Sequence, residues 1–297
     1  MSEKLEEIGA RIAGVHQLDA VVNAMRGIAA VRVQQARDQI RAVDSYTSTI
    51  TAAMGRIVPQ VAPGPENAHA GNERAALVVF CAEQGFAGAF SERVLDAVSA
   101  DAGGADLYLV GSRGRALATE RNIAPAWTNA LPAHSPAIPK LANAICNTLY
   151  ARINAGALGR LDVVFSTWDT GEVRVVRRAL FPIDFSLIAS SPETLPPLTN
   201  LPAAALLETL GADYVHALLC NAALHSFVAE NEARMSAMAQ ARSQIERQLG
   251  ELKARERHVR QDAITAEIIE LAAGELANRS DRRKRRTRES APFAPSS

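Results

Sequence analysis

Two glycine-bearing turns are the strongest candidates for chemistry in this chain. Residues 85–88 (GFAG) and 111–115 (GSRGR) each follow an apolar run and precede a stretch with helical spacing. A helix N-terminus offers free backbone N–H groups to a phosphate, so either turn could in principle hold a nucleotide. Neither turn has the GxGxxG spacing of a dinucleotide site, and GxxxxGK[ST] does not occur in the sequence. We therefore predict that these glycines make tight turns in a small sheet and hold no cofactor.

The histidines and cysteines have no spacing typical of a metal site or a catalytic centre. The six histidines form no HExxH motif, and no Ser, His and Asp residues fall in a recognisable catalytic motif. The three cysteines are far apart, without a CxxC pair or a nearby histidine. We interpret Cys81, Cys146 and Cys220 as buried, reduced thiols, and we predict neither a metal site nor a catalytic residue.

The elements that would position any site are dominated by two long stretches without proline. No proline precedes Pro59, and none lies between Pro202 and Pro292. An internal proline removes a helix hydrogen bond and clashes with the preceding turn, so each stretch can be one continuous helix. At about 1.5 Å per residue, residues 1–58 would form a rod of about 80 Å and residues 203–278 one of about 110 Å.

Both proline-free stretches carry the alternating four-and-three spacing of a coiled coil, which predicts that they pair as antiparallel helices. Asp19 interrupts the first seam, and Arg242 and Glu256 fall on the second. We interpret these two as a device that fixes register or as a locally opened seam, with contact to a partner as the alternative. The first seam comprises Leu5, Ile8, Ile12, Val15, Ala36, Ile40, Val43, Thr47, Ile50, Met54 and Ile57, and the second Met235, Met238, Arg242, Ile245, Leu249, Leu252, Glu256, Val259 and Ala263.

The middle of the chain, residues 71–202, alternates between strand and helix patterns. This alternation predicts a Rossmann-like α/β domain with a mainly parallel sheet and right-handed crossovers. The last expected strand alternates Val and Arg, as an exposed edge or antiparallel strand does. Segments 59–71 and 190–202, rich in Pro, Gly and Asn, would be the joints. The expected strands are 75–81, 106–111, a weak one at 123–127, 161–168 and 173–181, and the expected helices are 90–100, 112–121 and 138–155.

Composition and charge separate the last residues from the rest of the chain. The 297 residues are 48% hydrophobic, and no run approaches the roughly 20 apolar residues of a membrane span. The chain has 32 basic and 32 acidic residues. Residues 279–297 hold seven Lys or Arg against two acids and few apolar side chains. We predict that this basic tail is disordered.

Motifs at both ends resemble the gamma subunit of the rotary F-type ATP synthase. Residues 5–15 (LEEIGARIAGV) and the Ala24-Met25-Arg26 triplet are similar to its opening helix. RMxAM at 234–238 and RQxxITxEIxE at 260–270 are similar to its final helix. Asn23 stands where a lysine is common in the family, so the chain resembles a divergent member.

This resemblance implies a function as the central rotor shaft, which couples ion-driven rotation to ATP synthesis or hydrolysis without catalysing either reaction itself. The implied partners are the alpha and beta subunits of the catalytic hexamer, the epsilon subunit and the membrane c-ring, with no nucleic acid and no membrane span. The implied location is peripheral, on the cytoplasmic face of a bacterial inner membrane.

By the same resemblance, five residues match positions that contact other subunits. Arg260, Gln261 and Thr265 match those that bond to a loop of a beta subunit, and Met25 and Arg26 match those whose contact with beta affects coupling. A coiled-coil scaffold, or a protein that binds nucleic acid through its basic tail, is the alternative. That alternative leaves RQxxITxE unexplained.

Overall fold

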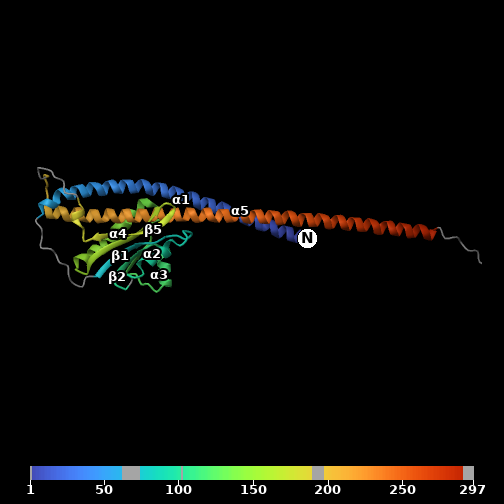
Figure 1. Ribbon diagram of the computed structural model, residues 1–297, viewed down its shortest axis with the longest axis horizontal. Coiled ribbons are helices and arrows are strands. Elements are labelled where there is room, and N and C mark those ends of the chain that lie inside the picture. The colour runs from blue at the N-terminus through green and yellow to red at the C-terminus, as the bar shows by residue number, and fades with distance from the viewer. Residues whose placement is uncertain (1, 62–73, 102, 189–196, 290–297) are drawn as a thin grey trace, which may run out of the picture. The chain divides into compact units, whose positions relative to one another are not determined.

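The computed structural model describes residues 2–61, 74–101, 103–188 and 197–289, excluding the side chains of residues 2, 3, 187, 277, 278 and 280–289. The two longest elements are the helices α1 (Ser2–Ile57) and α5 (Ala203–Glu289) (Figure 1). α1 continues into the short 3₁₀ helix η1 (Val58–Gln60). The two predicted long helices are therefore confirmed, while both predicted joints lie largely outside the described residues.

The end of the last helix differs from the prediction. α5 does not end near Asn278 but continues to Glu289, so disorder was the wrong prediction for residues 279–289. Lys and Arg are good helix formers, and no glycine or proline occurs between Gly274 and Pro292. The charged composition therefore does not stop a helix that has already formed. The remaining tail residues, 290–297, lie outside the described part.

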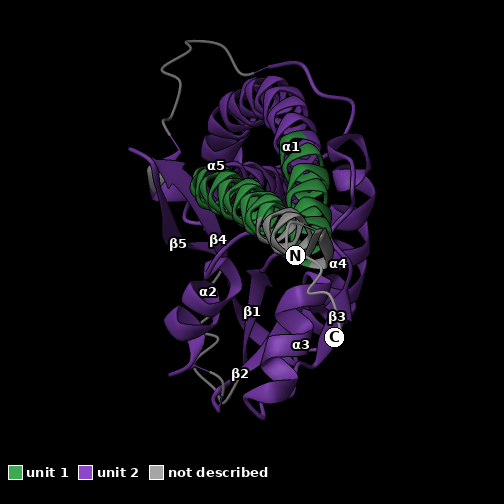
Figure 2. Cartoon of the chain, turned by 90° about the vertical axis from the view of Figure 1, so that its right-hand side faces the viewer, with its two compact units in different colours: residues 1–23, 240–297 green, residues 24–239 purple. Residues whose placement is uncertain are grey.

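The chain divides into two compact units, which cut across the predicted domains (Figure 2). One unit contains residues 1–23 and 240–297, and the other contains residues 24–239. In the first unit the two helix segments are antiparallel, since Asn23 lies 3.4 Å from Arg242 while Arg11 lines a groove with Arg255. Every residue of the predicted second seam that belongs to this unit, from Arg242 to Ala263, is buried or half-buried. The seam is confirmed in this unit.

The second unit contains the rest of the coiled coil. The seam residues Ala36, Met54 and Ile57 are at most 3% exposed. Polar bonds between the helices support the same antiparallel direction: Asn221 donates to Asp44 over 2.6 Å, and Arg37 forms an ion pair of 2.6 Å with Glu232.

By length and composition alone, α5 is long and apolar enough to cross a membrane. Core helices of soluble proteins meet the same criterion, and a third of the apolar window of α5 is buried.

The second unit also contains a five-stranded sheet of order β3-β2-β1-β4-β5. All neighbouring strands are parallel except β4 and β5, which are antiparallel. This confirms the mainly parallel α/β domain and its antiparallel edge strand. The strands are β1 (Arg74–Phe80), β2 (Ala105–Val110), β3 (Trp127–Asn129), β4 (Leu158–Asp169) and β5 (Glu172–Phe181).

The short third strand lies later than predicted. β3 begins at Trp127, whereas the sequence pattern placed a weak strand at 123–127. Pro125 interrupts that run, and proline cannot donate a backbone hydrogen bond to a neighbouring strand. The pairing with β2 therefore starts only beyond the proline, where Tyr108 is the partner of Trp127.

Helices cover both faces of the sheet. One face packs against α2 (Phe90–Val98) and α3 (Ser112–Glu120), and the other against α4 (Ile138–Asn154) with parts of α1 and α5. Alternate residues of β1 enter the two cores: Leu77 and Val79 face the first, Val78 and Phe80 the second. Short 3₁₀ helices, η2 (Ser135–Ala137) and η3 (Phe185–Leu187), complete the fold.

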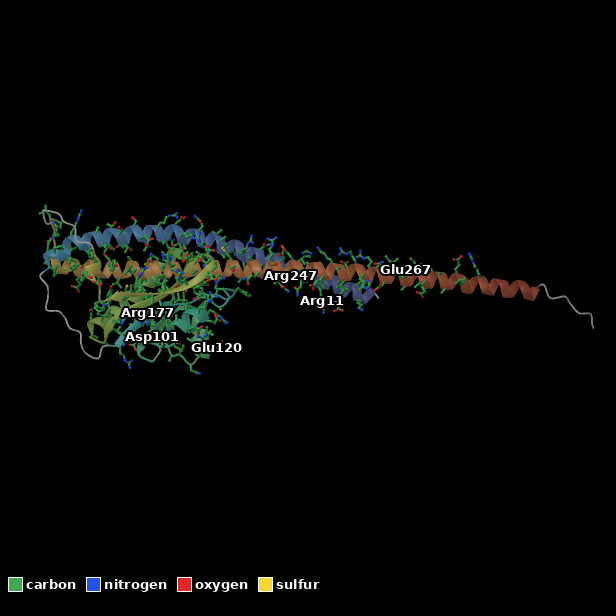
Figure 3. All side chains as sticks on the ribbon, in the orientation of Figure 1. Arg11, Asp101, Glu120, Arg177, Arg247 and Glu267 are labelled. Carbon is green, nitrogen blue, oxygen red and sulfur yellow. The ribbon has the colours of Figure 1, made fainter. Side chains whose placement is uncertain are left out.

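Buried charge on the sheet is neutralised by two arginines. Asp162 of β4 has a side chain that is 3% exposed, and it accepts from Arg177 of β5 at 2.8 Å and from Arg160 of its own strand at 3.0 Å. Arg177 also lies 2.9 Å from Asp101; both residues are labelled in Figure 3. A buried carboxylate is tolerated only when it is paired and hydrogen-bonded. Arg177 therefore helps to hold the edge strand β5 on the sheet.

Candidate functional site

The glycines of the second turn are required by close packing. Gly111 has φ +109°, and a Cβ atom there would lie 2.5 Å from the carbonyl oxygen of Cys81. A Cβ atom on Gly114 would lie 2.2 Å from Cβ of Cys81. Only glycine fits at either position, because real Cβ contacts are far longer. The first amino acids of α3 thus lie directly against the end of β1.

Carboxylates of the chain itself accept from backbone amides just before the first turn and within the second. Glu230 of α5 accepts from the amides of Glu83 and Gln84 at 3.1 and 3.2 Å. Glu83 in turn accepts from the amide of Ser112 at 2.9 Å, from its hydroxyl at 2.7 Å and from the amide of Leu131 at 2.8 Å. At the second turn a phosphate would need to displace Glu83. The arrangement therefore supports the predicted structural role of the second turn.

A buried ion pair on α5 completes this cluster. Arg234 lies 2.5 Å from Glu230, and both side chains are 4% exposed. Arg234 also donates to the carbonyl oxygens of Gly85 at 3.3 Å and Gln84 at 3.4 Å, and to Oδ1 of Asn231 at 3.0 Å. We name Glu83, Glu230 and Arg234 with their backbone partners the turn cluster. Sequence reasoning noted Arg234 only as part of a motif and missed the cluster; the signal was Glu and Arg four residues apart in an otherwise apolar helix face.

The cysteines are buried thiols, as predicted, but the expectation of no nearby histidine is wrong for one of them: a ring nitrogen of His216 lies 3.8 Å from Sγ of Cys220. All three are at most 5% exposed. Burial raises the pKa of the Cys81 thiol to about 12 and that of Cys220 to about 11. A thiol is nucleophilic only as its thiolate, so these groups are inert near neutral pH. Among the described residues, no three His, Cys, Asp or Glu side chains gather as a metal site.

Two of the predicted contact residues lie on α1, in the unit with the sheet. Arg26 is exposed, and the neighbouring Met25 is half-buried. Arg26 lines a groove of about 470 Å³ together with Gly27, Trp168 of β4 and Glu232 of α5. A cation at the rim of an open groove is available to an acidic partner.

The other three predicted contact residues lie within two turns of α5, in the other unit. Arg260 forms an exposed ion pair of 2.8 Å with Glu256, and the hydroxyl of Thr265 donates to the carbonyl oxygen of Gln261 over 2.9 Å. The side chains of Arg260, Gln261 and Thr265 are exposed. They form one polar patch, while Met25 and Arg26 belong to the other unit, so the structure describes two separate groups.

Beyond this patch, α5 presents apolar side chains to solvent. Every described side chain from 264 to 276 is exposed. A helix that carries large apolar residues on an uncovered surface is typical of a protein interaction site. The residues concerned are Ile264, Ile268, Ile269, Leu271 and Leu276, each more than half exposed. Arg247 and Glu267 mark the charged surface of the same helix in Figure 3.

Antiparallel coiled-coil helices, an α/β domain whose second turn is bound by a carboxylate of the chain itself, and exposed apolar helix surfaces define an interaction protein. Comparison with known proteins gives the particular family. The ATP synthase family model matches residues 4–277, so the chain belongs to this family.

The curated relatives are ATP synthase gamma chains. That of Frankia casuarinae is 28% identical over 92% of this chain and 97% of its own length. That of Beutenbergia cavernae is 26% identical over 89% of this chain and 94% of its own length. Among solved structures, a chain of the Euglena gracilis mitochondrial ATP synthase in rotational state 3 has a TM-score of 0.64, with 12% identity over 100% of this chain and 99% of its own length. The last likeness is one of fold. The family match leaves residues 278–297, and with them the basis of the nucleic-acid alternative, outside it.

Proposed function

We infer that the chain is the central rotor shaft of an F-type ATP synthase, which couples ion-driven rotation of a c-ring to ATP synthesis or hydrolysis in beta subunits. The observation that carries this inference is the family match over residues 4–277, together with an antiparallel coiled coil beside the α/β domain. The chain itself is a non-catalytic subunit. This is supported by the turn cluster, in which Glu83 binds the amide of Ser112 that a phosphate at the second turn would need.

The physical basis of the coupling is the asymmetry of the shaft. Two helices that differ in sequence present a different surface in every direction to a surrounding ring of similar subunits. Each catalytic site then experiences different contacts, and rotation changes those contacts in sequence. Coupling between distant sites requires only such differential contacts with alternative states.

The residues that meet the catalytic hexamer are proposed from the family motifs and from their exposure. Arg260, Gln261 and Thr265 bond to a beta subunit, and their exposed polar groups support this role. Arg26 meets acidic residues of a beta subunit as the shaft turns, with Met25 packing beside it. The uncovered apolar surface of residues 264–276 then becomes buried within the alpha and beta ring.

The remaining partners are proposed for the α/β domain. It binds the epsilon subunit and the c-ring, as a rotor must if torque is to enter the shaft from the membrane. The complex is peripheral, on the cytoplasmic face of a bacterial inner membrane. The similar chains of Euglena gracilis and Tetrahymena thermophila belong to a rotor and to a central stalk with a c-ring, which supports this arrangement.

Reconstitution tests the function. The chain is co-expressed with alpha and beta subunits of its own organism, and the complex is isolated through a tag on beta. We expect the chain to co-purify and ATP hydrolysis to depend on it. An active hexamer that never retains the chain would contradict the proposal.

The proposed contacts are tested by a double variant of that complex, Gln261→Leu with Thr265→Val. A hydrogen bond to a charged group contributes about 1.5–3 kcal/mol, so assembly or ATP turnover should fall by about tenfold or more. Gln248→Leu, on the same helix within the coiled-coil region, is the matched control and should leave both unchanged. Normal turnover in the double variant would refute the assignment of these residues.

A further inference from the structure

The turn cluster lies at the position where open α/β sheets place their ligands. β1 lies between β2 and β4, and the chain leaves β1 towards β2 but reaches β4 only after β3. The strand order therefore reverses between β1 and β4. In folds of this kind, the crevice outside the carboxyl ends of those two strands is the usual ligand site.

In this chain, α5 occupies that crevice. Its Ser226 accepts over 3.0 Å from the amide of Ser166, in the part of β4 that extends beyond its pairing with β1. One turn later, Glu230 accepts from the amides that follow β1. The apolar neighbours of these residues belong to different cores: Val228 packs on the α4 side of the sheet, and Ala229 on the side of α2 and α3. This part of the helix thus contacts both cores at the end of the sheet.

We propose that α5 is the built-in ligand of the α/β domain, with Glu230 in the position of a bound anion and Arg234 as a clamp on the same turn. Glu230 and Arg234 are positioning residues: they fix the rotation of α5 about its own axis relative to the sheet. Given the proposed function, torque passes between the α/β domain and the shaft through this pair.

The geometry explains why this pair, rather than the surrounding apolar contacts, fixes the rotation. Apolar burial is non-directional, so a helix can turn in an apolar groove at little cost. The pair makes four hydrogen bonds to backbone groups of three consecutive residues, 83–85, and these bonds depend on direction. A shift by one residue would turn Glu230 by about 100° and leave this buried ion pair without its bonds to the backbone of residues 83–85, which is unfavourable.

Hydrogen exchange of the full chain tests the pair without reference to the complex. In Glu230→Gln, the amides of Glu83 and Gln84 should exchange about tenfold faster or more, because the charged acceptor is lost, while the amides within β1 keep their rates. Glu246→Gln is the matched control, since Glu246 forms an ion pair at the same spacing with Arg242 but is exposed. Unchanged exchange at both amides would overturn the proposal.

A variant that unfolds is distinguished by faster exchange throughout β1. If Glu230→Gln unfolds, the Ser226→Ala variant is measured in its place. This substitution removes one neutral acceptor at the same crevice. Its predicted effect is faster exchange at the amide of Ser166 and at Glu83 and Gln84. Faster exchange at Ser166 alone would mean that the Ser226 and Glu230 contacts do not act together. It would overturn the idea that α5 binds the crevice as one unit.

Single-molecule rotation of the reconstituted complex tests the mechanical role. The hexamer is fixed to a surface, and a bead is attached to the exposed surface of the α/β domain. In Glu230→Gln, the angular distribution of the bead during catalytic pauses should broaden, and the Glu246→Gln complex should match the wild type. An unchanged distribution would overturn the mechanical role. Wild-type complexes that never rotate would instead contradict the proposed function.

Discussion

Gly114→Ala tests the packing that holds α3 against the sheet, because two known effects oppose each other at this position. In an exposed helix, replacing glycine by alanine stabilises by about 1 kcal/mol. Here the added Cβ atom would lie 2.2 Å from Cβ and 2.7 Å from Sγ of Cys81. Carbon atoms in contact are about 3.5–4.0 Å apart, so α3 would need to move by more than an ångström.

The clash should outweigh the gain in helix propensity. Overpacking a well-packed core costs about 1–3 kcal/mol, and Cys81 is fully buried at the end of a central strand. We expect Gly114→Ala to lose about 2 kcal/mol, a fall in Tm of about 4–8 °C for a unit of this size. The assay is thermal unfolding followed by the fluorescence of Trp127 and Trp168.

Two variants isolate the cause. Gly250→Ala lies in α5 where a new Cβ atom meets nothing within 4 Å, so it should stabilise the chain or leave it unchanged. Cys81→Gly removes the obstructing Cβ atom, and combined with Gly114→Ala it should cost less than the two single changes added together. A Gly114→Ala protein as stable as the wild type would refute the argument from close approach.

Two further changes test the coiled coil and a half-buried histidine of α5, His225. Arg242→Leu replaces a seam arginine whose ion pair with Glu246 is exposed. It should raise the stability of that unit by about 1 kcal/mol in urea unfolding, and a decrease would indicate that Arg242 is needed for register. Burial lowers the pKa of His225, so the unfolded chain binds protons that the folded chain does not. The free energy of unfolding should therefore fall as the pH drops below about 6.5. Between pH 7.5 and pH 5.5, His225→Gln should lose less of this free energy than the wild type. Equal losses would exclude this histidine as a cause.

The sequence was most informative where structure is local and periodic. The second seam was predicted residue by residue, from Met235 to Ala263, because burial of an apolar stripe in a coiled coil follows directly from spacing. Strand and helix order in the α/β domain was also predictable from alternating apolar runs. The end of α5 was not, because a cation-rich composition is typical both of disordered tails and of solvated helices.

The turn cluster could not be predicted from spacing, because its members lie far apart in the chain. Glu230 binds amides about 147 residues earlier in the sequence. A single sequence shows that Glu230 and Arg234 are one helical turn apart, but an exposed pair such as Arg242 and Glu246 has the same separation. Only the fold determines which pair is buried.

The seam could be predicted and the turn cluster could not because different kinds of interaction hold them together. Long-range order along the shaft needs only repeated weak apolar contacts, and these tolerate substitution as long as the spacing is kept. The connection between shaft and sheet depends instead on a few directional bonds in one crevice, where a single lost partner leaves a buried charge. We therefore expect exchanges among apolar seam residues to be mild, whereas loss of Glu230 or Arg234 should have the largest effect of any single charged residue in the unit with the sheet. The test replaces each charged residue of that unit in turn and measures the free energy of unfolding in urea. An equally large loss from replacing a residue of an exposed pair would refute this ranking.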